Sequence, residues 1–334
     1  MILHIVGNRP QFIKLAPVSK EIRKRGYKEV IIHTGQHYDE NMSDIFFREL
    51  DIPNPNENLL IGSGTHAEMT GTAMIRIEKT LEKYEPQCVI LYGDTDSTLA
   101  GALATAKMNI PIVHIEAGVR TNRSRNPEEI NRIVVDHLSE LLFCSDKDSE
   151  NNLKREGLGK NAVWVGDVMY DTFLQFQHLN DGETISPYGV KKDEYVLLTW
   201  HRQENTESRD KMLQIINFLK EINYKIICPL HPRTRKKLQE FNLIGELEKI
   251  PNALFITPVG YIEMIKLMIN AHIILTDSGG VSKESFFAGV KCILMVDLDI
   301  WPDLIKNQWI TKLDFDSRES VDSALRLIRG ERRE

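Results

Sequence analysis

Carboxylates and arginines are concentrated in the stretch HIEAGVRTNRSRNPEEINR, residues 114–132. Glu116 interrupts an apolar run at its start, and Glu128 and Arg132 stand at its end with further arginines between them. Paired carboxylates can act as general acid and base, and neighbouring cations can stabilise charge that develops during a reaction. The same composition also suits an ordinary solvated loop, so the meaning of this stretch depends on the elements that position it.

Short apolar runs recur along the chain, separated by segments with apolar residues at every third or fourth position. This pattern predicts βαβ units, and therefore an α/β protein with parallel sheets covered by helices. Strands are expected near residues 2–7, 29–35, 88–94, 110–118, 141–146 and 162–167, and then near 195–202, 225–232, 253–259, 273–279 and 292–296. We expect domains over 1–172 and 173–330, with a Gly-, Pro-, Asp- and Lys-rich stretch at 176–195 as part of their connection.

Polar residues stand where several of these apolar runs end. They are Asp94, Glu116, His201, His231 and Asp277. Ligands of open α/β sheets bind outside the carboxyl ends of the strands. One polar residue at a strand end more often only caps the next helix, but five of them across both halves favour a site. Two such sheets, edge to edge, would form a cleft lined by both sets.

Bulk composition narrows the possible partners. The 334 residues are 42% hydrophobic and 27% charged, as in globular proteins, and this length favours two domains. The net charge of −6 suggests neither nucleic acid nor a membrane surface as a partner. The apolar runs are too short to cross a bilayer, and the first residues lack the features of a signal peptide. Four widely separated cysteines favour free thiols, so we expect a cytoplasmic protein.

Two strand-to-helix turns could bind an anion. In GNRPQFIK, residues 7–14, Gly7 permits a tight turn, and Arg9 and Lys14 lie near the start of a helix, where backbone N–H groups favour negative charge. The two cations could equally lie on a solvated helix face. In TDSGGVSKES, residues 276–285, the predicted phosphate-binding turn has Ser282 near the helix cap and Glu284 one turn into the helix; its binding residues are Ser278, Gly279 and Gly280.

Neither a cofactor nor a metal is predicted. GSGTHA, residues 62–67, imitates a dinucleotide-binding motif, but only LLI precedes it, and the acidic residue expected further on falls in a helical segment. His114 and Glu116 share one strand face and could supply metal ligands, yet no HExxH or comparable cluster accompanies them. We expect a site without a redox cofactor and without a metal.

Seven motifs in order resemble those of the non-hydrolysing UDP-N-acetylglucosamine 2-epimerase family, over nearly the whole chain. They are GNRPQFIK, TGQH, GDTDSTLAG, HIEAGVRT, NPEEINR, HRQEN and TDSGG. The resemblance implies two Rossmann-like domains in a glycosyltransferase-B-like arrangement, a homodimer, and a UDP-sugar substrate in the cleft. It implies a catalytic set of Asp94, Glu116, Glu128, Arg132 and His201, and a UDP-binding set of Arg9, Lys14, His201, Arg202, Ser278, Gly279, Gly280 and Glu284.

The reaction that the resemblance implies, inversion at C2 of a 2-acetamido sugar, restricts the chemistry. C2 has no adjacent carbonyl group, so its proton is not acidic enough for direct removal and return. Without a convincing dinucleotide motif, we favour elimination of UDP to a glycal-type intermediate, followed by re-addition. This route needs acid–base groups on opposite faces of the sugar and cations for the departing diphosphate. A glycosyltransferase of the same fold, a hydrolysing 2-epimerase and a non-catalytic UDP-sugar-binding protein remain the alternatives.

Departures from the commonest family pattern bear on the substrate. Gln11 stands where many members have an acidic residue, and Trp301 where the UDP-N-acetylglucosamine branch often has arginine. HRQEN and LHPRTR more closely resemble the branch that acts on UDP-2,3-diacetamido-2,3-dideoxyglucuronate. A substrate carboxylate would need an extra cation, for which an arginine within residues 120–125 is the candidate.

Overall fold

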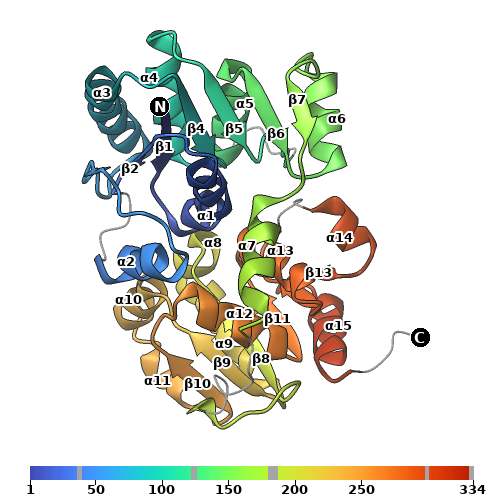
Figure 1. Ribbon diagram of the computed structural model, residues 1–334. Helices are drawn as coiled ribbons and strands as arrows, with labels where there is room; N and C mark the ends of the chain where they lie inside the picture. The colour runs from blue at the N-terminus through green and yellow to red at the C-terminus, as the bar shows by residue number, and fades with distance from the viewer. Residues whose placement is uncertain (36–39, 122–125, 180–186, 298–300, 331–334) are drawn as a thin grey trace. The chain divides into compact units, whose positions relative to one another are not determined.

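The computed structural model describes residues 1–35, 40–121, 126–179, 187–297 and 301–330 (Figure 1). The chain divides into two compact units, Met1–Thr172 and Phe173–Glu334. No helix among these described residues is both long and apolar enough to cross a membrane.

Within its described residues, unit 1 forms a parallel sheet in the order β3-β2-β1-β4-β5-β6-β7. The strands are β1 (Ile2–Val6), β2 (Glu29–His33), β3 (Glu57–Asn58), β4 (Cys88–Tyr92), β5 (Ile112–Ile115), β6 (Leu141–Cys144) and β7 (Ala162–Trp164). The helices are α1 (Arg9–Lys24), α2 (Glu40–Glu49), α3 (His66–Tyr84), α4 (Asp96–Lys107), α5 (Pro127–Leu138), α6 (Lys147–Arg155) and α7 (Val168–Gln177), the last of which runs into unit 2.

Unit 2 has a second parallel sheet over the part that the structure describes, in the order β10-β9-β8-β11-β12-β13. Its strands are β8 (Tyr195–Thr199), β9 (Lys225–Pro229), β10 (Ala253–Ile256), β11 (Ile273–Thr276), β12 (Cys292–Leu294) and β13 (Ile310–Lys312). Its helices are α8 (Gln203–Thr206), α9 (Arg209–Lys220), α10 (Pro232–Glu240), α11 (Ile244–Glu248), α12 (Tyr261–Asn270), α13 (Gly279–Phe287), α14 (Pro302–Lys306) and α15 (Arg318–Ile328).

Burial of both sheet faces explains the continuous apolar runs. Every residue of β8 and β11 is buried, as expected for parallel strands covered by helices. In unit 1, α4 packs against β1 and β4 through small residues. A Cβ added at Gly101 would lie 2.8 Å from Leu91 Cδ2, so glycine sets this close approach.

The predicted α/β class and all the predicted strands are confirmed, while β3 and β13 were missed. These two strands have two and three residues, too few to show a period. The charged stretch at 114–132 begins in β5 and ends in α5, which starts at Pro127 behind an Asn126 cap. Its second carboxylate therefore lies in the first turn of a helix, not in a solvated loop.

Candidate active site

An enclosed ion pair joins α1 to the end of β5. The Lys14 ammonium lies 2.6 Å from Glu116 Oε1, and the two side chains are only 6% and 15% exposed. Burial opposes the charge of Lys14, but the carboxylate of Glu116, with smaller contributions from Asp94 and Asp167, outweighs burial and raises the lysine pKa. Glu116 has a φ of 70°, a left-handed conformation that non-glycine residues rarely adopt. Such backbone strain is common at functional sites and places this carboxylate beside Lys14.

A second cation, Arg132 of α5, reaches the loop after β4. Its Nη2 donates to Asp94 Oδ2, and its Nη1 donates to Glu129 Oε2 over 3.0 Å. Burial again opposes the charge, yet the carboxylates of Asp94, Glu116 and Glu129 outweigh it and raise the arginine pKa. The structure therefore brings four of the predicted residues of unit 1 together as two ion pairs at the carboxyl edge of its sheet, Lys14 with Glu116 and Arg132 with Asp94.

The adjacent carboxylates Glu128 and Glu129 have different surroundings. Glu129 is 3% exposed and accepts hydrogen bonds from Thr121 N and Thr121 Oγ1, the latter over 2.9 Å. Glu128 is half-buried in the first turn of α5, where its backbone N donates to Asn126 Oδ1 over 3.4 Å. Glu129 was missed at the sequence level, although its position three residues before Arg132 indicates an ion pair within one helix.

The turn after β1 is held by Gln11, which is 1% exposed. Gln11 Oε1 accepts from Gly7 N over 2.6 Å, while Nε2 donates to Tyr92 O over 2.7 Å and to Thr98 Oγ1 over 2.9 Å. An amide has both the acceptor and the donors that this position uses, whereas a carboxylate has no donor for the Tyr92 carbonyl. Gln11 thus ties the turns after β1 and β4 together. Nearby, Arg9 opens α1 with its guanidinium 5.1 Å from the centre of the Phe46 ring.

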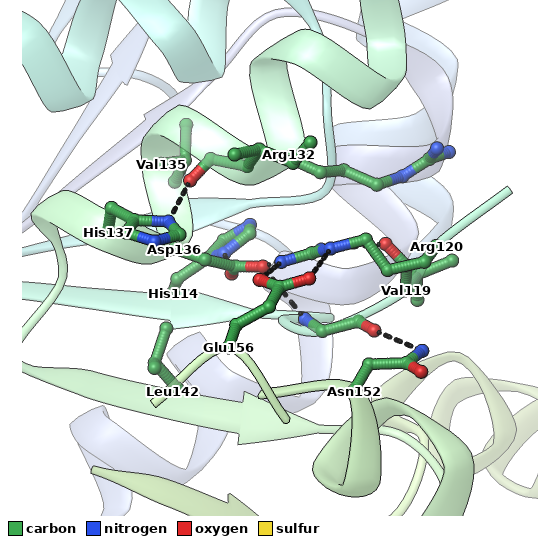
Figure 2. Close-up of polar contacts among 12 residues, drawn as sticks. His114, Val119, Arg120, Arg132, Val135, Asp136, His137, Leu142, Asn152 and Glu156 are labelled. Carbon is green, nitrogen blue, oxygen red and sulfur yellow. Dashed lines mark hydrogen bonds and ion pairs between the residues drawn. The ribbon is translucent and has the colours of Figure 1, made fainter. Parts of the chain in front are cut away.

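The structure decides two questions that the sequence raised on this segment, the possible metal ligand His114 and the candidate cation Arg120. His114 is fully buried, and its Nδ1 lies 2.7 Å from Asp136 Oδ1 (Figure 2). Its Nε2 lies 2.7 Å from Gly93 O, so neither ring nitrogen is left for a metal. Arg120 is occupied by Asp136 at 2.8 Å and Glu156 at 2.6 Å, so it is not the extra cation for a substrate carboxylate. The other arginines within 120–125 lie outside the described residues. Over the described part of the chain, no cluster of three potential metal ligands occurs.

In unit 2, the buried carboxylate of Asp277 organises the segment after β8. It accepts hydrogen bonds from the backbone N of His201 over 3.0 Å and of Arg202 over 2.9 Å, and from Asn205 Nδ2 over 3.3 Å. Burial raises the Asp277 pKa to about 6, and these hydrogen bonds hold it from rising further. The His201 Nδ1 lies 3.5 Å from Asp277 Oδ1. Asp277 therefore fixes the backbone of two predicted binding residues.

His231 is a helix cap, as a polar residue at a strand end most often is. It caps α10, where its Nδ1 accepts from Arg233 N over 3.1 Å. Its ring nevertheless lies 5.3 Å from the ring of His201, so the carboxyl ends of β8 and β9 bring two imidazoles together.

The start of α13 has the predicted form with one correction. Ser278, not Ser282, is the N-cap, since its Oγ accepts from Val281 N over 3.3 Å. Gly280 lies in the first turn, where an added Cβ would meet only Ser278 Oγ at 3.9 Å, so the helix start has open space beside it. Glu284 follows one turn later and accepts from Tyr261 Oη over 2.8 Å.

Trp301 lies against this same helix start. Its Nε1 donates to Gly279 O over 3.0 Å, and Lys283 Nζ lies 3.8 Å from the centre of its ring. Trp301 is thus a neighbour of the predicted phosphate-binding turn. A cation over an aromatic face is an attractive arrangement.

Comparisons with known proteins identify the family. A family model described as UDP-N-acetylglucosamine 2-epimerase matches residues 20–333. A UDP-N-acetylglucosamine 2-epimerase homolog of Methanococcus maripaludis is 49% identical over 311 residues, covering 92% of this chain and 87% of that protein. The UDP-2,3-diacetamido-2,3-dideoxy-D-glucuronate 2-epimerase of Pseudomonas aeruginosa is 46% identical over 312 residues, covering 91% and 85%.

A solved structure agrees with these relatives. The crystal structure of Methanocaldococcus jannaschii UDP-GlcNAc 2-epimerase in complex with UDP-GlcNAc and UDP has a TM-score of 0.92 and 40% sequence identity, with 100% of this chain and 94% of that chain covered. The resemblance drawn from the seven motifs is confirmed by both kinds of comparison. This chain belongs to the UDP-N-acetylglucosamine 2-epimerase family.

Proposed function

We propose that this chain is an isomerase that inverts C2 of a UDP-2-acetamido sugar, from gluco to manno, without net hydrolysis. Family membership and the names of the relatives support this activity. The reaction proceeds by elimination of UDP across C1 and C2, followed by re-addition of UDP and of a proton to the other face of C2. Two proton-handling groups and a cationic cradle for the diphosphate are the requirements of this route.

The observation that carries the proposal is the pair of ion pairs in unit 1, Lys14 with Glu116 and Arg132 with Asp94. Two carboxylates held by buried cations at one sheet edge are suited to exchange protons with a substrate, because their positions are set before the substrate binds. In this proposal Glu116, Asp94 and Glu128 are the acid–base groups. Lys14 and Arg132 fix the positions of the carboxylates with which they are paired.

Unit 2 supplies the nucleotide-binding groups in the same proposal. The first-turn N–H groups of α13, at Gly279 and Gly280 behind Ser278, favour a diphosphate because a helix start attracts negative charge. His201 and Arg202, fixed by Asp277, contribute positive groups for the departing diphosphate. In this proposal Arg9 of unit 1 also contacts the nucleotide sugar, and Glu284, one turn into α13, accepts from a ribose hydroxyl.

The proposed sugar is UDP-2,3-diacetamido-2,3-dideoxyglucuronate, with UDP-N-acetylglucosamine as the second candidate. The motifs that depart from the other branch support this order; the relatives' names support both sugars, since one named for the first is 46% identical and a homolog named for the second is 49% identical. Arg120 is engaged with Asp136 and Glu156, so the candidate cation for a C6 carboxylate is another arginine of residues 120–125, and these lie outside the described residues.

Assays of both nucleotide sugars side by side test the proposal. The protein should convert one of them to its manno epimer with no accumulation of free UDP, and kcat/KM should be higher for the diacetamido-glucuronate. Glu116→Gln and Glu128→Gln should abolish turnover while retaining UDP binding. Glu140→Gln, at an exposed carboxylate beyond the end of α5, is the matched control and should behave as the parent.

Each rival activity predicts a different result in the same assays. Steady release of UDP with free sugar would identify a hydrolysing epimerase. Turnover that needs a second substrate would identify a glycosyltransferase. Binding without reaction of either sugar would leave a nucleotide-sugar-binding protein.

We further propose a cytoplasmic homodimer. The family resemblance supports the dimer, and the four free thiols are the form that a reducing cytoplasm maintains. Light scattering of the purified protein gives the mass directly; a single species of 38.4 kDa would exclude the dimer.

A further inference from the structure

A buried histidine lies beneath the proposed acid–base groups without being one of them. His114 is the third residue of β5, two positions before Glu116, and its ring is fully buried. Its Nδ1 lies 2.7 Å from Asp136 Oδ1 on α5, and its Nε2 lies 2.7 Å from the carbonyl oxygen of Gly93, the residue before Asp94. The ring therefore bridges β5, α5 and the loop after β4.

The partners of the ring fix its protonation. A peptide carbonyl can only accept, so Nε2 must carry a hydrogen. Asp136 faces the guanidinium of Arg120 at 2.8 Å and accepts from Gly118 N over 3.1 Å, so it is a carboxylate that also can only accept. Nδ1 must then carry a hydrogen as well, because the alternative sets two acceptors against each other at 2.7 Å. With both hydrogens in place the ring is an imidazolium.

Asp136 extends this contact to the turn that contains Glu116. Its Oδ2 accepts from Gly118 N over 3.1 Å and lies 2.8 Å from Arg120 Nη1. Arg120 continues to Glu156, which lies just beyond α6, and Figure 2 shows the four charged side chains following one another from His114 to Glu156. Among these four side chains, each charge lies beside an opposite charge, as buried ionic groups require.

The same carboxylate lies on the stripe of α5 that faces the site. Glu128, Arg132 and Asp136 recur at intervals of four residues, so they lie along one face of the helix. On this stripe, Arg132 forms an ion pair with Asp94. Asp136 is hydrogen-bonded to Nδ1 of His114, and Nε2 of the same ring is hydrogen-bonded to the carbonyl oxygen of Gly93. Helix α5 and the loop after β4 are thus joined twice, once at the surface of the site and once beneath it.

We propose that His114 is a positioning residue, an imidazolium that fixes the Asp94 loop and the Glu116 turn against α5 through Gly93 and Asp136. The inference rests on the proposed function, since it assigns His114 a role in holding the proton-handling groups. It predicts a loss of turnover without a comparable loss of substrate binding, because the groups misplaced are those that act in the transition state.

The test compares His114→Gln with His137→Gln in the full-length protein. His137 is exposed on the same helix, and its Nδ1 lies 2.8 Å from Ile133 O. For His114→Gln we expect kcat to fall on the order of 100-fold, the effect of a misplacement near 1 Å, with KM and UDP affinity changed by no more than about threefold. His137→Gln should match the parent in all three.

A spectrum separates positioning from plain stability. With ¹⁵N-labelled histidine at pH 7, the parent should show one ring with both nitrogens protonated and protected from solvent, absent in His114→Gln and present in His137→Gln. Asp136→Asn should also remove this signal. If His114→Gln does not fold, Asp136→Asn replaces it in the test. A parent spectrum without such a ring, or a His114→Gln kcat within about twofold of the parent, would overturn the inference. If the parent epimerises neither sugar, the proposed function fails, and the spectrum still decides the state of the ring.

Discussion

Replacement of Gly118 by alanine tests how closely the turn after Glu116 is fitted to its surroundings. Gly118 has a φ of 80°, and its N donates to Asp136 Oδ2 while its O accepts from Asn152 Nδ2 over 3.0 Å. A Cβ at this position would lie 2.3 Å from the backbone oxygen of Ser149, which is buried in α6. Neither atom can move alone, because one belongs to a helix and the other to a turn held from both sides.

The chain offers a matched control at Gly157. Its φ is 81°, but a Cβ there would meet no atom within 4 Å. Both alanine variants pay about 1–2 kcal/mol for the left-handed backbone. Only at Gly118 must the new Cβ and Ser149 O separate from 2.3 Å to at least 3.4 Å, and overpacking of this kind costs about 1–3 kcal/mol more. The expected loss is therefore about 2–5 kcal/mol for Gly118→Ala and about 1–2 kcal/mol for Gly157→Ala.

Urea denaturation followed by circular dichroism measures the two losses, and initial epimerisation rates measure the effect on the site. Movement of the Glu116 turn should lower kcat of Gly118→Ala on the order of 100-fold, whereas Gly157→Ala should retain the parent rate. If the two variants have the same denaturation midpoint and the same rate, the packing of this turn has been misjudged.

Two further substitutions test the supports of each unit. Glu129→Gln removes the carboxylate that holds Thr121 and Arg132, so the free energy of unfolding should fall by about 1–3 kcal/mol and kcat should fall with it; an unchanged kcat would separate Glu129 from the site. Asp277 has a pKa of about 6 in the folded protein, above its ordinary value of 3.8, so the folded state binds this proton more tightly than the unfolded chain does. Relative to Asp277→Asn, the parent should therefore lose unfolding free energy as pH rises from 3.8 to about 6, and parallel profiles of the two proteins would contradict the raised pKa.

Periodicity alone predicted the strands and the sheet edge at which the polar residues meet, because a parallel sheet brings all its strand ends to one side. Periodicity could not predict which of those residues contact one another. Lys14 and Glu116 are 102 positions apart and Arg132 and Asp94 are 38 apart, and such contacts depend on the order of the strands. The motif resemblance, not the pattern, supplied the residue roles.

Neighbouring residues of like charge were a second limit. Glu128 and Glu129 are indistinguishable by type, yet one turns toward Thr121 and Arg132 and is buried, a difference set by how α5 is rotated against the sheet. Likewise, the sequence alone left His114 open as a possible metal ligand, because its acceptor partners Asp136 and Gly93 lie 22 and 21 positions away. Local patterns do not record such partners.

The central claim, C2 inversion by elimination and re-addition, is tested most directly by the hydrogen at C2 of the product. The protein is incubated in D2O with UDP-2,3-diacetamido-2,3-dideoxyglucuronate and, separately, with UDP-N-acetylglucosamine, and the epimer formed is examined by proton NMR and mass spectrometry. Elimination and re-addition should leave one deuterium at C2 of the manno product, with no excess of free UDP. An epimer that retains its original hydrogen at C2 would contradict this mechanism.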